Sequence, residues 1–224
     1  MNFKKLHSIF FYYNLKQICL VLLTGVVLFL GFGCKGSKKA DTILFSVLEA
    51  KRTGLYFENK LTPTEDFNMF KYMYFYNGAG VGAGDFNNDG LSDLFFTSNQ
   101  GQNKMYMNKG GLKFEDVTTA AQIPIDSSWS TGVSVIDINN DGLLDLYVSR
   151  VGNYEKLQSH NQFLICQGLD SNHIPIYKDE AEIMGLNFAQ FGTQAAFFDY
   201  DLDGDLDVFV MNHSLRYNGT FNER

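Results

Sequence analysis

Three short segments of this sequence place acidic or amide side chains at alternate positions around a glycine. They run from Asp85 to Asp93 (DFNNDGLSD), from Asp137 to Asp145 (DINNDGLLD) and from Asp199 to Asp207 (DYDLDGDLD). Carboxylates this close repel one another, so a compact loop that contains them is destabilised unless a cation lies between them. Side-chain oxygens at loop positions 1, 3, 5 and 9, a backbone carbonyl at 7 and a glycine at 6 suit Ca²⁺, which takes about six to eight oxygen ligands. The pattern predicts three calcium-binding loops.

Two other interpretations of these loops compete with this one. Asp, Asn and Gly are ordinary turn residues, so the first alternative is three solvated turns without metal. The second is the EF-hand, which needs a bidentate Glu at position 12 and a helix on either side of the loop. Position 12 is Phe96, Val148 and Val210 in the three segments, and the flanks are rich in β-branched and aromatic residues. This composition argues against an EF-hand.

Each acidic loop is flanked by two apolar segments that predict the strands of a hairpin. These segments are 81–84 and 94–97, 132–136 and 146–149, and 195–198 and 208–211. Two more predicted strands follow the first loop (103–108 and 113–118) and the second (161–165 and 175–179), with Tyr106/Leu164, Phe114/Tyr177 and Asp116/Asp179 as matching pairs. The loops begin at Asp85, Asp137 and Asp199, which are 52 and 62 residues apart. Repeats of this length predict an all-β fold, a β-propeller whose blades are four-stranded antiparallel sheets.

The repeat region, residues 71–224, supplies about two and a half blades, whereas propellers close with four to eight. An unclosed set leaves sheet edges and faces exposed. Either the chain is a fragment of a longer protein or its open end is covered by something else, and of the two we favour the fragment. A leading segment, residues 41–70, comes before the repeats, with a short strand or helical turn expected over 41–52. The aromatic run Tyr72–Tyr76 predicts a further strand.

Residues 1–33 predict an export signal that is not part of the fold. Lys4 and Lys5 give this segment a positive start, and residues 18–32 form an apolar run. This arrangement is typical of a secretory signal that ends in a small residue. The alternative is an uncleaved transmembrane anchor, although the run is short for a membrane span of about 20 residues.

The end of this segment resembles a bacterial lipoprotein signal, in which the cysteine after the small residue is lipidated and becomes the mature N-terminus. Cys34 is the cysteine in that place, while Gly31 and Phe32 depart from the Leu and Ala/Ser that usually precede it. Residues 34–40 then form a short polar tether that holds the domain off the membrane.

The repeats themselves resemble FG-GAP/VCBS repeats, the calcium-loop blades also found in integrin α-subunit propellers. The stretches that carry the resemblance are GVGAGDFNNDG, from Gly80, and FFDYDLDGDLD, from Phe197. Because these repeats follow a lipoprotein-like signal, the chain is most similar to the large bacterial VCBS-repeat lipoproteins. The resemblance implies side-chain calcium ligands at Asp85, Asn87, Asp89 and Asp93, at Asp137, Asn139, Asp141 and Asp145, and at Asp199, Asp201, Asp203 and Asp207. It also implies carbonyl ligands at Leu91, Leu143 and Asp205, and so up to three structural Ca²⁺ ions.

Composition supports an exported binding module and argues against nucleic-acid binding. The net charge is −7, and nearly half of the 25 acidic residues lie in the three loops. No basic patch is visible, so a polyanionic partner is disfavoured. With Cys19 in the signal and Cys34 as the lipid candidate, Cys166 is the last cysteine, which excludes an intramolecular disulfide in the mature chain. Its apolar neighbours predict a small buried hydrophobe.

No group of residues predicts catalysis. His160 and His173 lack partners at metal-binding spacing, and His213 is expected to make a polar contact at a blade edge or, alternatively, to line a ligand site. Trp129, the single tryptophan, is expected to pack between blades, with a sugar-stacking platform as its functional alternative. The clustered acids that could serve glycoside hydrolysis are already assigned as calcium ligands.

We therefore expect an exported, lipid-anchored, non-catalytic scaffold that binds or adheres to a protein or glycan ligand, with no nucleic-acid partner. Its expected location is the bacterial cell envelope, as an outer-membrane lipoprotein that faces the periplasm or the surface. The alternatives are a carbohydrate-processing enzyme, such as a Ca²⁺-dependent polysaccharide lyase, and a component of solute binding or surface assembly that has no activity alone.

Overall fold

The computed structural model of this chain describes residues 45–214 with the exception of residue 127. The predicted export signal, the tether, Cys34 and the end of the repeat region lie outside the described residues. Contacts divide the chain into two units, Met1–Val47 and Leu48–Arg224, and the sheets belong to the second unit. Within the described residues, no helix has the length and apolar character needed to cross a membrane.

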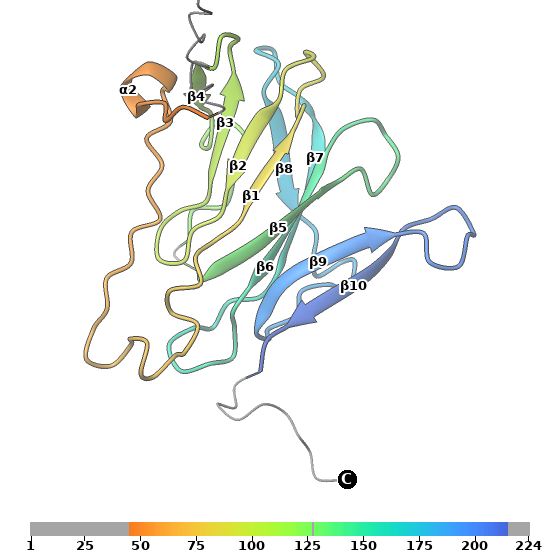
Figure 1. Cartoon of the computed structure of the whole chain (residues 1–224). Helices are drawn as coiled ribbons and strands as arrows, with labels where there is room; N and C mark the ends of the chain where they lie inside the picture. Colours follow the sequence, from red (N-terminus) through yellow and green to blue (C-terminus); the bar gives the residue numbers. More distant parts are fainter. Residues whose placement is uncertain (1–44, 127, 215–224) are drawn as a thin grey trace, which may run out of the picture. The chain divides into compact units, whose positions relative to one another are not determined.

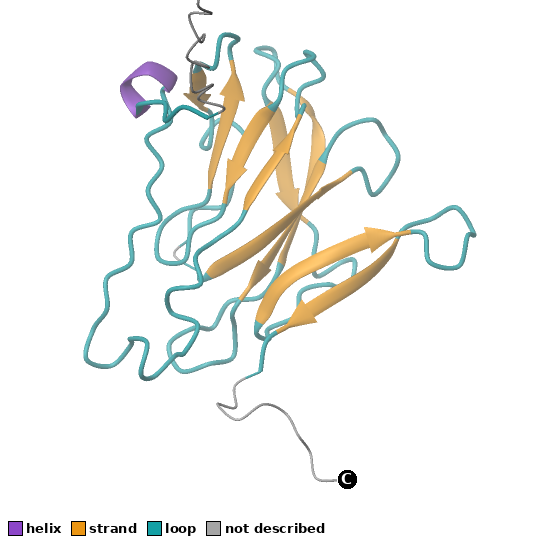
Figure 2. Cartoon of the chain, viewed as in Figure 1, coloured by secondary structure: helices purple, strands orange, loops and turns teal. Residues whose placement is uncertain are grey.

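As far as it is described, the second unit is built from antiparallel β-sheets with one short helix, α2 (Ala50–Thr53) (Figures 1 and 2). The first sheet has the order β1 (Val81–Gly84), β2 (Asp93–Phe96), β3 (Lys104–Asn108) and β4 (Phe114–Asp116). The second sheet has the order β5 (Ser130–Ile136), β6 (Asp145–Arg150), β7 (Gln162–Leu169) and β8 (Pro175–Asp179). A hairpin of β9 (Gly192–Phe198) and β10 (Asp207–Asn212) follows. The prediction of an all-β chain with four-stranded antiparallel sheets is confirmed.

The two complete sheets share one register, as the matching pairs in the sequence predict. The pairs that establish this are Tyr106↔Asp116 and Asn108↔Phe114 in the first sheet, and Leu164↔Asp179 and Cys166↔Tyr177 in the second. Each acidic loop connects the first and second strands of its sheet, and the third loop connects β9 to β10. The sequence repeat therefore corresponds to a structural repeat.

The first strands of the two sheets and of the hairpin lie side by side, with β5 between β1 and β9 (Figure 1). Polar side chains connect them, because Thr131 Oγ1 donates to the Gly192 carbonyl at 2.8 Å and Gln194 Nε2 donates to the Val133 carbonyl at 3.1 Å. The approach is close enough that a Cβ added at Gly132 would lie 2.3 Å from the Thr193 carbonyl oxygen. A glycine at this position is a packing requirement.

Apolar side chains fill the space between the two sheets and between the second sheet and the hairpin. One cluster joins the first and second sheets, with Phe95 and Met105 against Leu146 and Leu164, all fully buried. Full burial of side chains of this size stabilises the fold by about 1.5–3 kcal/mol each. Cys166 belongs to the same cluster as a free thiol, which confirms its interpretation as a small buried hydrophobe.

The prediction of a strand over Tyr72–Tyr76 is wrong. The structure places this run in consecutive turns, with the Phe75 amide donating to the Tyr72 carbonyl at 3.0 Å. The rings of Tyr72 and Phe75 instead pack around Trp129 at centroid distances of 5.7 and 5.3 Å. Strand preference of aromatic residues reflects packing on a pleated surface, and here a separate aromatic cluster buries them better.

The leading segment is held on the first sheet. Phe57 stacks on Phe96 at 4.8 Å, and Asn59 Nδ2 donates to Asn99 Oδ1 at 2.8 Å. Of the two alternatives for residues 41–52, the structure shows a helical turn only at the end of the segment, where α2 begins at Ala50 and Gly54 terminates it in the left-handed conformation. Residues 45–49 have no regular structure, and residues 41–44 lie outside the described residues.

Candidate functional site

The first residue of each acidic loop organises the backbone of that loop. Asp85 accepts the amide N–H groups of Asp89 at 3.0 Å and Gly90 at 2.7 Å. Asp137 does the same for loop positions 5 and 6 at 3.1 and 2.9 Å, and Asp199 at 3.2 Å for both. The carboxylate at position 1 therefore folds the loop around itself and keeps unused lone pairs on both oxygens.

Positions 3 and 5 bring further hard oxygen donors beside the first. In the first loop Asn87 Oδ1 accepts the amide of Asp89 at 3.2 Å, and its Nδ2 donates to Asp89 Oδ2 at 3.1 Å. Asn139 and Asp141 repeat both contacts in the second loop at 3.1 and 2.9 Å. Carboxylate and amide oxygens are the donor set that Ca²⁺ prefers, so the residues present fit this ion chemically.

The aspartate at position 9 is enclosed by protein in the two complete sheets. Asp93 is fully buried and accepts the amides of Phe86 at 3.0 Å and Asn108 at 2.7 Å. Asp145 is likewise buried and accepts the amides of Ile138 at 3.1 Å and Cys166 at 2.8 Å. Both carboxylate oxygens are thus already bound by backbone donors.

Burial raises the pKa of the Asp93 and Asp145 carboxyls, and the neighbouring loop carboxylates raise it further, while the backbone N–H bonds oppose these effects. The two buried acids therefore lie in a negative field that a cation in the loop would relieve.

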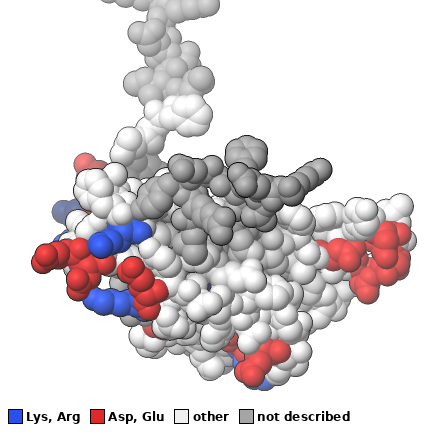
Figure 3. All heavy atoms as spheres, turned by 90° about the horizontal axis from the view of Figure 1, so that it is seen from below, with Lys and Arg blue, Asp and Glu red and all other residues white. Residues whose placement is uncertain are grey.

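In the third loop three predicted ligands converge. One oxygen from each of Asp199, Asp201 and Asp207 lies within 4.8 Å of the other two. Asp207 is exposed and accepts one backbone amide, from Tyr200 at 2.9 Å. Acidic side chains gather at this end of the β9–β10 hairpin, at the right of Figure 3. Asp203, the fourth predicted side-chain ligand of this loop, is not part of this group. Its carboxyl interacts with that of Asp205, which was predicted to bind through its carbonyl, and this interaction lowers the pKa of Asp203 and raises that of Asp205.

Sequence reasoning missed a second conformational requirement of the loops. Position 4 is left-handed in all three, with φ of 57° at Asn88, 55° at Asn140 and 63° at Leu202. Asn tolerates this region well, whereas Leu is strained there. The signal was present as the Asn-Asn pair in the first two loops. The proposed carbonyl ligands Leu91, Leu143 and Asp205 stay predictions.

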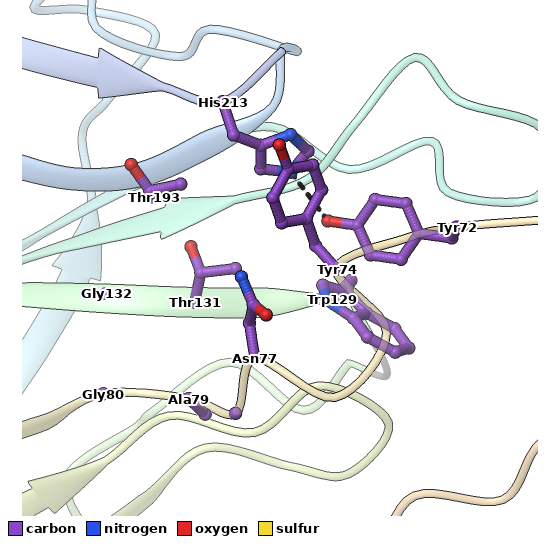
Figure 4. A pocket seen from close by; sticks show the side chains of 11 residues that line it. Tyr72, Tyr74, Asn77, Ala79, Gly80, Trp129, Thr131, Gly132, Thr193 and His213 are labelled. Carbon is purple, nitrogen blue, oxygen red and sulfur yellow. Dashed lines mark hydrogen bonds between the residues drawn. The ribbon is translucent and has the colours of Figure 1, made fainter. Parts of the chain in front are cut away.

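A pocket of about 230 Å³ lies at the opposite ends of β1, β5 and β9 from the acidic loops (Figure 4). Its lining comes from the turn run (residues 72–80), from the starts of β5 and β9 and from the end of β10, namely Tyr72, Tyr74, 77–80, Trp129, 131–132, Thr193 and His213. Sequence reasoning singled out Trp129 and His213 separately but had no signal that would bring the other residues to them.

Trp129 and His213 occupy different parts of this pocket. Trp129 is 2% exposed and packs edge-on against Phe67 and Tyr72. Its interpretation as a packing residue is confirmed, but its ring partners come from residues 67–75 and not from a neighbouring blade. The sugar-stacking platform is wrong because the ring is covered. His213 Nε2 lies 2.8 Å from the Tyr72 hydroxyl (dashed line in Figure 4), which confirms a polar contact.

Burial sets the protonation of this pair. Desolvation raises the pKa of Tyr72 far above its ordinary value and lowers the pKa of His213. At neutral pH the hydroxyl and the imidazole are therefore both uncharged, and the histidine tautomer sets which of them donates the hydrogen bond. The polar wall of the pocket carries no net charge from these two groups.

Comparison with known proteins supports the repeat assignment over part of the chain. The family described as FG-GAP-like repeat matches residues 85–148, from the start of the first acidic loop to β6. Cartilage acidic protein 1 of Xenopus tropicalis is 28% identical over 139 residues, which cover 62% of this chain and 20% of the frog protein. The chain thus spans about a fifth of the length of this relative.

Proposed function

We propose that this chain is a calcium-stabilised β-propeller segment that serves as a non-catalytic scaffold for binding or adhesion. Its two four-stranded sheets and its hairpin are two and a half blades of that propeller. Its ligand is a protein or a glycan, and each acidic loop holds one structural Ca²⁺.

The observation that carries the proposal is the repetition of one loop architecture. In all three loops the position-1 carboxylate binds the same two backbone amides, and in the first two the position-9 carboxylate is buried beneath the loop. A loop that only reverses the chain between two strands needs neither of these acids. Buried and clustered negative charge is retained at a cost in stability, which a bound cation offsets.

We further propose export and anchoring through the lipid on Cys34, as in the bacterial VCBS-repeat lipoproteins. The apolar run of residues 18–32 and the cysteine that follows it support this part. Display at the envelope, where calcium is available, suits a module whose folding depends on that ion.

Calcium titration of a loop variant tests the proposal. We expect Asp203→Ala to weaken calcium binding by about tenfold or more, because it removes one charged oxygen ligand. Asp170→Ala is the matched control, since Asp170 is also an acid that accepts turn amides, at 2.8 and 2.9 Å, but lies outside the loops. Isothermal titration calorimetry measures both. Equal affinities in the two variants would contradict the proposal.

A further inference from the structure

The pocket opposite the acidic loops is formed where the strand pairing is interrupted. The register between β5 and β6 shifts between Ser130 and Val133, and the register between β9 and β10 shifts between Met211 and Asn212. Each shift leaves an extra residue at the start of a strand, β5 or β9. Thr131 and Thr193 lie at these two places and line the pocket. β-Bulges of this kind redirect side chains and are frequent beside binding sites.

Two polar groups of the pocket are not engaged by protein. Within the described residues, no hydrogen bond is made by the side-chain amide of Asn77 or by the hydroxyl of Tyr74. Both residues belong to the turn run, and Figure 4 shows the Asn77 amide beside Thr131 and the Tyr74 ring next to His213. The Tyr74 and His213 ring centroids are 3.9 Å apart. The pocket therefore offers one donor–acceptor amide, one hydroxyl and aromatic surface.

The other polar side chains of the lining make hydrogen bonds to protein or carry no charge. Thr131 Oγ1 donates to backbone carbonyls at 2.8 and 3.0 Å, and Thr193 Oγ1 donates to the Met211 carbonyl at 2.9 Å. Their oxygens remain available as acceptors. None of the residues that line the pocket is Asp, Glu, Lys or Arg. A charged ligand would find no counter-ion there, and a purely apolar ligand would leave the free amide and hydroxyl unpaired.

We propose that this pocket binds an uncharged, hydroxyl-rich ring, a single pyranose residue of a glycan. Its volume of about 230 Å³ lies below the range of about 300–1,000 Å³ typical of drug-sized ligands, so it suits one ring. A pyranose presents hydroxyls to Asn77 and Tyr74 and a C–H face to an aromatic ring. The inference rests on the proposed binding function and selects a glycan as its ligand.

Ligand-observed NMR with a panel of methyl pyranosides tests the proposal. We expect saturable binding of at least one neutral pyranoside to the full chain, and no preference for galacturonic acid as a charged probe. Asn77→Ala should weaken this binding by about five- to tenfold, since one ligand hydrogen bond is lost. Tyr74→Phe, which keeps the ring, should weaken it less than Tyr74→Ala.

Matched controls separate the pocket from general surface effects. Asn172→Ala changes an exposed asparagine of the β7–β8 turn, and Tyr76→Ala removes an exposed tyrosine of the same turn run. Both should bind the pyranoside as the unmodified chain does. Absence of binding to every pyranoside, or equal losses in the pocket and control variants, would overturn the proposal.

A calcium titration on the same samples distinguishes the two proposals. Calcium binding without pyranoside binding overturns the pocket proposal alone. If neither calcium nor a pyranoside binds, the proposed function fails as well.

Discussion

The first two acidic loops and the third have nearly the same sequence pattern but different surroundings. Asp93 and Asp145 each receive a second backbone amide from the third strand of their sheet, from Asn108 and Cys166, and both acids are fully buried. Asp207 at the same position receives one amide and is exposed. The third strand of a sheet thus converts a loop carboxylate into a buried structural acceptor.

Because of this difference, the loops are stabilised in two ways. In the complete sheets, protein donors fix the position-9 carboxylate whether or not an ion is bound. In the β9–β10 hairpin, the carboxylates converge with fewer protein donors, and the loop carries five aspartates against three in each of the others. We therefore expect the third loop to depend most strongly on a cation.

The largest expected effect comes from breaking a buried position-9 contact. Asp145→Asn should reduce the free energy of unfolding by about 2–3 kcal/mol in chelator, because one of two buried amide donors then faces an amide N–H₂ group. Asp207→Asn should have a much smaller effect under the same conditions. Urea unfolding of both variants measures this, and similar losses would remove the distinction between the loops.

A smaller effect should follow from exchanging the residues at position 4. Leu202→Asn should stabilise the chain by about 1 kcal/mol, because Asn adopts the left-handed conformation with less strain than Leu. Asn140→Leu should destabilise it by a similar amount. Thermal unfolding of the two reciprocal variants checks the sign, and stabilisation by both would show that strain at this position is irrelevant.

Much of the fold was predictable because local pattern and repeat point the same way. The hairpins around the loops and the pairing of Tyr106 with Asp116 follow from the repeated sequence. The conformation of the run Tyr72–Tyr76 was not predictable, because Tyr72 packs against Trp129 and Tyr74 against His213, which lie 57 and 139 positions further along the chain. Strand preference carries no information about such distant partners.

The candidate site was likewise predictable only in part. The spacing of the loop acids predicted four converging side chains in the third loop, and three of them, Asp199, Asp201 and Asp207, do converge, whereas Asp203 is not in this group. The burial of Asp93 and Asp145 was hidden, since it depends on the register of a third strand with the second. The ion pair of buried Arg150 with Asp126, at 2.9 Å, had no local signal either.

Thermal unfolding in calcium and in excess chelator tests the central claim most directly. Each site filled to about 100 times its dissociation constant adds about 2.7 kcal/mol, and about 1 kcal/mol moves the midpoint of a chain this size by roughly 2–4 °C. The account predicts a midpoint at least about 5 °C higher in calcium, with the difference reduced by Asp203→Ala. An identical midpoint in calcium and in chelator would contradict it.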